Sequence, residues 1–301
     1  MTAELQCSES GTHGVRRVAR AQIEKALDAL GGRALSDDRV HVARKEIKKA
    51  RATLRLLRAA LGDSVYTREN SALRDAARPL SRIRDGKVLL DTLDRLVERF
   101  GAPARAVPMD GLRRALRRER TRTRREVLKG AAALKLQREL LKKAHGRAAR
   151  WPVGEHGWSI VGEGFARVYA KGRKALAAAE ADRTPANLHE WRKQVKYLWH
   201  QLQALQPLWP GPIGELADQA HQLADYLGDD HDLSVLRARI LYHKAEFPAA
   251  APRGELLSLI DRLRTELRDK AMVLGRRLYK EKPSAFEARF GQYWRDWQRR
   301  R

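Results

Sequence analysis

An internal repeat is the feature of this sequence that most constrains its fold. The pattern His-x-x-Arg-Lys-x-apolar-Lys begins at His41 and again at His189, 148 residues later. A second shared pattern, Asp-x-x-Val-Leu, begins at Asp85 and again at Asp232, 147 residues later. Two matches in the same order at nearly the same offset indicate a duplication. The repeat unit is far longer than that of a solenoid, so we expect two equivalent halves.

Helical periodicity runs through nearly the whole chain, which predicts an all-α protein with essentially no sheet. Thr184-Pro185 and Ser36-Asp37 have the composition of helix starts. Breaks are expected at Gly31-Gly32, at Gly62-Asp63, and in segments 101–103, 207–212 and 248–252. The predicted helices are 14–30, 38–61, 65–83, 87–100, 110–145, 158–181, 185–206, 213–227, 232–246, 254–281 and 284–298.

The two halves are predicted to form a pseudo-twofold pair of helical bundles. The halves cover about residues 10–145 and 156–298, and together they form a single domain of residues 10–298. The Gly- and Trp-containing stretch 145–158 lies at the midpoint of the chain and is the expected linker between them.

The net charge of the chain limits the classes of partner that it is expected to bind. The 62 Lys and Arg residues exceed the 37 Asp and Glu residues, which gives a net charge of +25. Because 43% of the chain is hydrophobic, a disordered polycation is excluded. The excess charge predicts a polyanionic partner: nucleic acid, polyphosphate or an anionic membrane. Cys7 is the only cysteine, which excludes a disulfide framework and a multi-cysteine metal site. With neither a signal pattern nor a long apolar run, we expect a soluble cytoplasmic protein.

Both copies of the histidine pattern predict a helix with one basic and one apolar face, placed at 100° per residue. The apolar positions, such as Ile47 and Val195, fall opposite the basic ones and are expected in the core. Glu46 and Glu190 fall off the basic faces. The residues of the basic faces are His41, Arg44, Lys45, Lys48, Arg51 and Arg55 in the first copy, and His189, Arg192, Lys193, Lys196 and His200 in the second.

Such a face either lies in solvent or binds an anion. Solvated faces usually mix the two signs of charge, whereas like charges stacked at successive turns destabilise a helix by a few tenths of a kcal/mol per pair. Lys and Arg at successive turns place positive charge about 5 Å apart along the helix, which suits a linear chain of phosphates. We therefore favour anion binding, and a solvated face remains the alternative.

The duplicated His-x-x-Arg-Lys-x-x-Lys helices and the Asp-x-x-Val-Leu companion resemble the CHAD family, the conserved histidine α-helical domain, from about residue 15 to residue 297. The resemblance implies two pseudo-twofold four-helix bundles whose basic faces line a central groove or pore that binds inorganic polyphosphate. It also implies polyphosphate granules or a polyphosphate-metabolising enzyme as partners. Tyr197 replaces the residue that matches Lys49, so the halves are not equal. The residues that inherit the binding role are His41, Arg44, Lys45, Lys48, His189, Arg192, Lys193 and Lys196.

Two further basic groups are candidates. Arg167, Lys171 and Arg173 surround Tyr169 just before the second histidine helix and are expected to line the same groove, because consecutive antiparallel helices are neighbours. The dense run from Arg113 to Lys129 is a second groove wall, a nucleic-acid patch or a solvated face.

The cluster Gly228 to Asp232 contains a His-Asp pair, which is typical of metal-dependent phosphohydrolases. His189, His221 and Asp261 are the candidate further ligands, but a helix start with Asp caps explains the cluster better. We therefore predict no metal site and no cofactor. Trp191, Trp199, Trp294 and Trp297 are predicted in the core rather than stacked on bases.

These observations predict a non-enzymatic protein that binds inorganic polyphosphate electrostatically, without contact to a membrane, in the cytoplasm or on polyphosphate granules. A basic helical protein that binds nucleic acid is the alternative, and a metal-dependent phosphohydrolase of the His-Asp type is a third class.

Overall fold

The computed structural model describes residues 5–6, 9, 11–32, 35–129, 134–154, 157–247 and 249–299. Within these ranges the chain forms eleven α-helices, two short 3-10 helices and no strand, which confirms the all-α prediction. None of the described helices is long and apolar enough to span a bilayer. The helices are α1 (Gly11–Leu30), α2 (Asp37–Leu56), α3 (Arg58–Phe100), α4 (Ala102–Arg105), α5 (Asp110–Val127), α6 (Lys135–Ala148), α7 (Ser159–Ala181), α8 (Pro185–Leu205), η1 (Gln206–Leu208), α9 (Pro210–Tyr242), η2 (Lys244–Glu246), α10 (Ala250–Leu278) and α11 (Pro283–Gln298).

The predicted starts of α2 and α8 are confirmed by their capping bonds. The Ser36 hydroxyl accepts a hydrogen bond from the backbone N–H of Arg39 at 3.2 Å. The Thr184 hydroxyl accepts one from the backbone N–H of Asn187 at 3.3 Å, and Pro185 occupies the first helical position. The two helices that carry the histidine pattern therefore begin with equivalent caps.

Several predicted boundaries are wrong. Segments 65–83 and 87–100 belong to the single helix α3, and segments 213–227 and 232–246 belong to α9. Gly86 lies inside α3 and does not break it. A side chain at this position would press on Arg120 of α5 at 3.1 Å, so the glycine permits α3 and α5 to pack closely. The predicted helix 110–145 is divided into α5 and α6, and residues 130–133 between them lie outside the described ranges. The predicted break at Gly62 is confirmed, since its φ of 73° interrupts α3.

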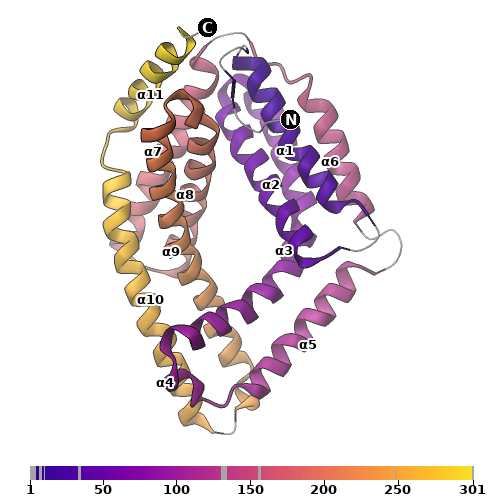
Figure 1. Ribbon diagram of the computed structural model, residues 1–301, viewed down its shortest axis with the longest axis vertical. Helices are drawn as coiled ribbons and strands as arrows, with labels where there is room; N and C mark the ends of the chain where they lie inside the picture. Colours follow the sequence, from indigo (N-terminus) through magenta and orange to yellow (C-terminus); the bar gives the residue numbers. More distant parts are fainter. Residues whose placement is uncertain are drawn as a thin grey trace.

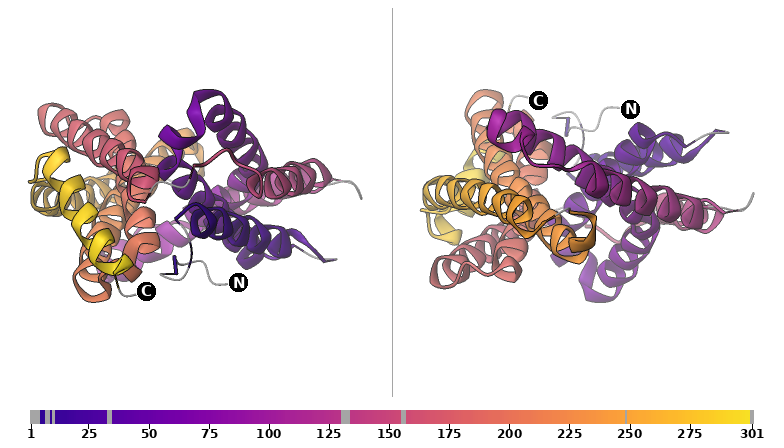
Figure 2. Two further views of the ribbon diagram at one scale, coloured as in Figure 1. Left: turned by 90° about the horizontal axis from the view of Figure 1, so that it is seen from above. Right: turned by 90° about the horizontal axis from the view of Figure 1, so that it is seen from below.

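Each half of the chain packs as a bundle, and the two bundles share one core (Figures 1 and 2). Helices α1, α2 and α6 pack with the first part of α3. Helices α7 and α8 pack with the first part of α9, the end of α10, and α11. Helices α1 and α7, α2 and α8, and α6 and α11 each begin 148 residues apart, which supports the duplication. The pseudo-twofold symmetry and the domain limits remain predictions.

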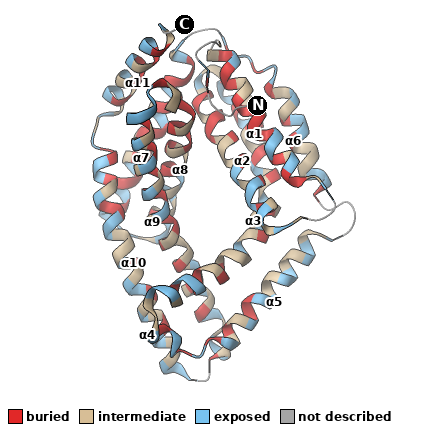
Figure 3. Ribbon diagram, viewed as in Figure 1, coloured by how far each residue is buried: buried red, intermediate tan, exposed pale blue. Residues whose placement is uncertain are grey.

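A second, smaller core lies below the bundles in Figure 1, where the ends of α3 and α9 meet α4, α5 and the start of α10. The end of α3 reaches α10, where Arg99 donates a hydrogen bond to Glu266 at 3.2 Å. Buried residues lie mainly where helices face one another (Figure 3). Because α3 and α9 contribute to both cores, they connect the halves.

The predicted linker is held against the first bundle rather than free. Helix α6 continues to Ala148, and residues 155–156 lie outside the described ranges. Trp151 is fully buried, and Arg16 of α1 donates a hydrogen bond to the carbonyl oxygen of Val153 at 3.3 Å. The stretch between the halves is therefore part of the folded structure.

Candidate polyanion-binding site

Helices α2 and α8 bury their predicted apolar faces and meet each other between the two bundles. Ile47 and Val195 are fully buried, as expected. The side-chain amide of Gln201 in α8 donates a hydrogen bond to the carbonyl oxygen of Ala52 in α2 at 3.2 Å. The guanidinium of Arg55 lies 3.7 Å from the ring centre of Tyr197. The two helices that carry the histidine pattern are thus in direct contact.

Four cations gather where α2 and α8 face each other: Arg44, Lys48, Arg192 and Lys196, which we call the interhelix cluster. Burial, with Lys196, Arg44 and Arg192 nearby, lowers the pKa of Lys48 to about 7. Burial, with Arg192 nearby, lowers the pKa of Lys196 to about 8. Burial also lowers the pKa of Arg44 and of Arg192. Like charges brought together in a partly dehydrated space are electrostatically costly.

Acidic residues from α3 and α9 also reach this cluster, so its charge is partly balanced within the protein. Asp85 lies 3.8 Å from the Arg44 guanidinium. Asp232 acts on both Arg192 and Lys196, and its burial raises the pKa of its own carboxyl group. The second shared pattern, Asp-x-x-Val-Leu, supplies both acids, so residues of both shared patterns lie at the site.

A pocket of about 140 Å³ lies at the end of α2 and is defined here as the side pocket; none of the four cations of the interhelix cluster lines it. Gly164 lets α7 approach α2 closely, because a methyl group there would collide with the carbonyl oxygens of Arg55 and Leu56. Four of the predicted site residues, from α2, α7 and α8, therefore come together here. The lining residues are Arg55, Arg58, Tyr66, Gly164, Arg167, Val168, Lys171, Lys193, Gln194 and Tyr197.

Some of the predicted residues have partners inside the protein. Arg51 donates a hydrogen bond to the side-chain oxygen of Asn70 at 3.1 Å. Arg167 pairs with Glu163 at 2.6 Å, and Lys193 pairs with Glu190. Glu190, which was predicted to lie off the basic face of α8, thus neutralises Lys193 on that face. The hydrogen bond from Lys193 lowers the pKa of Glu190.

The three histidines of the two patterns differ in environment. His41 lies at the surface, and partial loss of solvent, together with Arg84 and the basic residues of its own helix, lowers its pKa. The ring of His189 lies 4.8 Å from that of His231 in α9. His200 is buried, its pKa falls to about 3, and it contacts Gln203, so it is not part of the basic face.

Arg173 lies outside the side pocket. Lys171 and Arg167 are one helical turn apart in α7, whereas Arg173 is two residues beyond Lys171 and therefore about 200° around the helix. Arg173 acts instead on Tyr169, whose hydroxyl donates to the carbonyl oxygen of Leu278 at 3.1 Å. Its helical phase explains why Arg173 does not line the pocket. Lys45 is exposed on α2.

The basic run of α5 is partly neutralised by acids. Arg118 pairs with Glu246 at 2.9 Å, and Arg124 pairs with Asp37 at 3.0 Å. Arg113 pairs with Asp94, and Arg120 also pairs with Asp37. No residue of α5 lines the side pocket. This part of the run therefore connects α5 to its neighbours.

The cap interpretation of the Gly228–Asp232 cluster is wrong, because these residues lie inside α9. Asp230 is buried and accepts hydrogen bonds from Arg264 at 3.0 Å and from Arg268 at 2.8 Å, both in α10. Among the described residues, no three His, Cys, Asp or Glu side chains could hold a metal ion. The cluster serves packing and the interhelix site.

Trp191, Trp294 and Trp297 are buried in the core, as predicted. Trp199 is only partly buried, and its ring stacks on His221 at 3.9 Å and on His200 at 4.4 Å. Arg58 and Tyr66 of the side pocket were not predicted. In the sequence, Arg58 follows Arg55 closely before the break at Gly62, and Tyr66 lies just beyond that break.

The family model of the CHAD domain matches residues 17–241, and the chain belongs to this family. A comparison with curated proteins found no match. The fold is similar to PptA from Streptomyces chartreusis, with a TM-score of 0.66 and 17% identity over 91% of this chain and 100% of that chain. It is also similar to the crystal structure of the CHAD domain from the plant Ricinus communis, with a TM-score of 0.58 and 16% identity over 89% and 93% of the two chains.

Proposed function

We propose that this CHAD protein binds inorganic polyphosphate at the interhelix cluster and the side pocket, without chemical turnover. The observation that carries the proposal is the meeting of the two duplicated basic faces, which brings the cations of α2 and α8 into one partly buried space. A polyanion would relieve the repulsion among these cations. The family resemblance set out above implies the same ligand.

The shape of the site favours a narrow chain over a duplex. A duplex is usually bound by a protuberant helix or ribbon that enters its groove. Here the cations lie between helices, and the side pocket measures about 140 Å³. A flexible chain of phosphates could pass from Arg55 at the pocket towards Lys48, along successive turns of α2, and meet Arg or Lys at each turn.

Binding of this kind exchanges small counterions for the cations of the protein, so affinity should fall steeply with salt. Four acids, Asp85, Asp225, Asp229 and Asp232, lie near the cluster and balance part of its charge. Attachment to polyphosphate granules, or to an enzyme that acts on polyphosphate, is the physiological role that we propose for this binding.

The experiment is a binding titration of the full chain with labelled long-chain polyphosphate, and competition by duplex DNA and single-stranded RNA at equal phosphate concentration. We expect polyphosphate to be preferred, and its affinity to fall by roughly a hundredfold between about 50 and 200 mM salt. Tighter binding of DNA or RNA than of polyphosphate would contradict the proposal and support the nucleic-acid alternative.

A further inference from the structure

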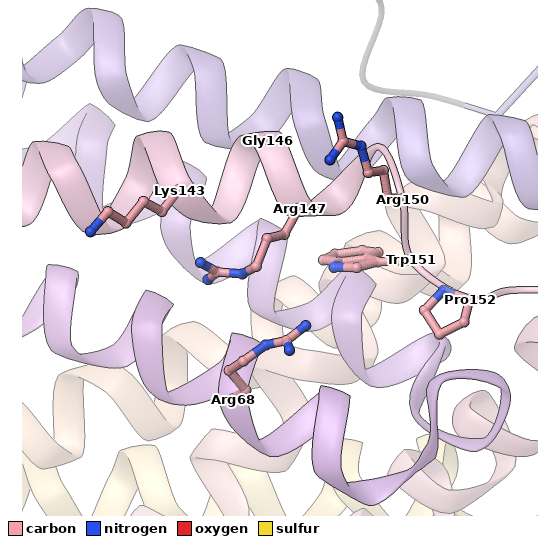
Figure 4. Close-up of a pocket in the computed structure, with 7 residues that line it drawn as sticks. All are labelled: Arg68, Lys143, Gly146, Arg147, Arg150, Trp151 and Pro152. Carbon is pink, nitrogen blue, oxygen red and sulfur yellow. The ribbon is translucent and has the colours of Figure 1, made fainter.

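A second basic pocket lies in the first bundle, between α3 and α6, and shares no residue with the side pocket (Figure 4). Its volume is about 310 Å³, which is at the lower end of the range for small-ligand pockets. The duplicated histidine patterns contribute none of its lining residues. These are Arg68, Lys143, Gly146, Arg147, Arg150, Trp151 and Pro152.

A buried carboxylate holds two of the arginines in place. Glu69 is fully buried and accepts hydrogen bonds from Nε and Nη2 of Arg147 at 2.7 and 2.9 Å. It also accepts a bond from Nε of Arg68 at 3.0 Å. Figure 4 shows both guanidinium groups in the space between the two helices. Since Glu69 uses only part of each guanidinium, the remaining N–H groups are held ready for a ligand.

The pocket carries more positive charge than Glu69 neutralises. Lys143 and Arg150 also line it, and neither side chain makes an ion pair or a hydrogen bond within the described part of the chain. Two of the four lining cations are bonded to Glu69, whereas Lys143 and Arg150 are exposed at the pocket, and in Figure 4 the guanidinium of Arg150 points away from those of Arg68 and Arg147. One carboxylate balances one of these four charges, so three positive charges remain at the pocket.

The indole of Trp151 adds an unused donor. Its ring is 1% exposed, and its Nε1 has no hydrogen-bond partner among the described residues. In Figure 4 this nitrogen is on the side of the ring that faces Arg68 and Arg147. A buried N–H without a partner costs free energy, and an oxygen atom of a ligand deep in the pocket would offset that cost.

The duplication did not produce this pocket. At the helix offset of 148 residues, the positions that match Lys143 and Arg150 are Gly291 and Gln298 in α11. The position that matches Arg68 is Glu215 at the offset of 147 residues, so the second bundle lacks three of the four cations. A pocket that occurs in one half only has a function separate from the paired faces of α2 and α8.

We propose that the α3–α6 pocket is an independent binding site for a phosphoryl-bearing anion of about the size of pyrophosphate. Its cations come from α3, from α6 and from the segment after α6, and a tetrahedral phosphoryl group directs oxygens to several sides at once. A single carboxylate is planar and presents two oxygens to one side. Pyrophosphate also carries enough negative charge to balance the three positive charges that remain after Glu69 neutralises one.

The test is isothermal titration calorimetry at low salt with pyrophosphate, on a variant in which Arg44→Gln and Arg192→Gln weaken the interhelix cluster. In this background we expect about one pyrophosphate per chain. Adding Lys143→Gln and Arg150→Gln should weaken the binding at least about tenfold, because two charge-assisted contacts are lost. Glu69 keeps both of its arginine partners in this variant, so the fold should be retained, which a thermal melt will check.

The matched control is Lys135→Gln with Lys142→Gln, which removes the same charge from exposed positions of α6 outside the pocket. It should leave pyrophosphate affinity within about twofold. The proposal would be overturned if both pairs of substitutions weakened pyrophosphate binding equally. It would also be overturned if the variant with the weakened interhelix cluster bound no pyrophosphate, or if malonate bound as tightly as pyrophosphate. Loss of long-chain polyphosphate binding in the cluster variant tests the proposed function separately.

Discussion

Lys48 and Lys196 illustrate what a single residue contributes to this site. Each amine lies among cations of the facing helix, and both pKa values fall to near neutrality, to about 7 and about 8. Lys48 faces Lys196 and Arg192 of α8, Arg44 of its own helix, and Asp85 of α3. Asp232 and Asp225 of α9 attract Lys196. The empty site therefore favours loss of protons, and a bound polyanion would favour their uptake.

The unliganded protein should accordingly become more stable above neutral pH. The unfolded chain returns Lys48 to its ordinary pKa of 10.5, so it binds more protons than the folded chain between about pH 7 and pH 10. The destabilisation is full below pH 7 and is relieved as the pH rises through this window. Thermal melts at pH 7, 8 and 9 measure it. Lys48→Met with Lys196→Met should raise the melting temperature at pH 7 and flatten the pH dependence; an unchanged dependence would contradict the assignment.

Asp230 provides a test of a buried charge away from the cluster. Asp230→Ala leaves Arg264 and Arg268 without their shared carboxylate, and should lower the free energy of unfolding by about 3 kcal/mol. Chemical denaturation measures this loss. Asp269→Ala, which removes the exposed partner of Arg183, should cost less than about 1 kcal/mol. Similar costs for the two variants would show that Asp230 is not a structural counter-charge.

At the scale of residues, the sequence was sufficient to predict which residues form the basic faces of α2 and α8, and insufficient to predict which residues surround those faces. Periodicity within one helix places Arg44 and Lys48 on one face. The acids Asp85 and Asp232 come from other helices, so no spacing within α2 or α8 could reveal them. Arg173 was assigned to the site by proximity in sequence, and its phase on α7 puts it elsewhere.

At the scale of elements, the approach of α7 to α2 determines the side pocket. Gly164 is where the two helices come closest, against the carbonyl oxygens that end α2. Gly164→Ala should push the helices apart, lower the free energy of unfolding by about 1 to 3 kcal/mol, and weaken polyphosphate binding. Denaturation and the binding titration measure the two effects.

The matched control is Gly254→Ala in α10, where an added methyl group meets nothing within 4 Å. Alanine is the better helix former, so this variant should be stabilised by up to about 1 kcal/mol and bind normally. If Gly164→Ala also stabilised the protein, the close contact of α7 with α2 would be refuted.

Element boundaries were predictable where capping chemistry is local and unpredictable where glycine serves packing. Ser36 and Thr184 indicated the starts of α2 and α8, and Gly62 indicated a break. Gly86 and Gly228 resembled breaks in the same way, yet they lie inside helices, one against Arg120 and the other near Arg192. Sequence patterns do not distinguish a glycine that ends a helix from one that admits a neighbour.

On the scale of the whole molecule, basic residues gather in three regions of a chain whose net charge is +25. The interhelix cluster with the side pocket holds cations from both duplicated patterns. The α3–α6 pocket holds a second group in one half only. The basic run of α5 is partly paired with acids, and exposed arginines such as Arg117 and Arg125 remain on it. We expect polyphosphate to bind the first region and not the third.

The most direct test is the affinity for labelled long-chain polyphosphate of two variants that lose the same charge, at one salt concentration. Arg44→Gln with Arg192→Gln should weaken binding by at least about tenfold without lowering the melting temperature of the free protein, because two charge-assisted contacts are lost and repulsion is relieved. Arg117→Gln with Arg125→Gln should bind within about twofold of the unaltered chain. If the variant with Arg44→Gln and Arg192→Gln kept its affinity for polyphosphate and the variant with Arg117→Gln and Arg125→Gln lost it, polyphosphate would bind on α5 and not at the interhelix cluster.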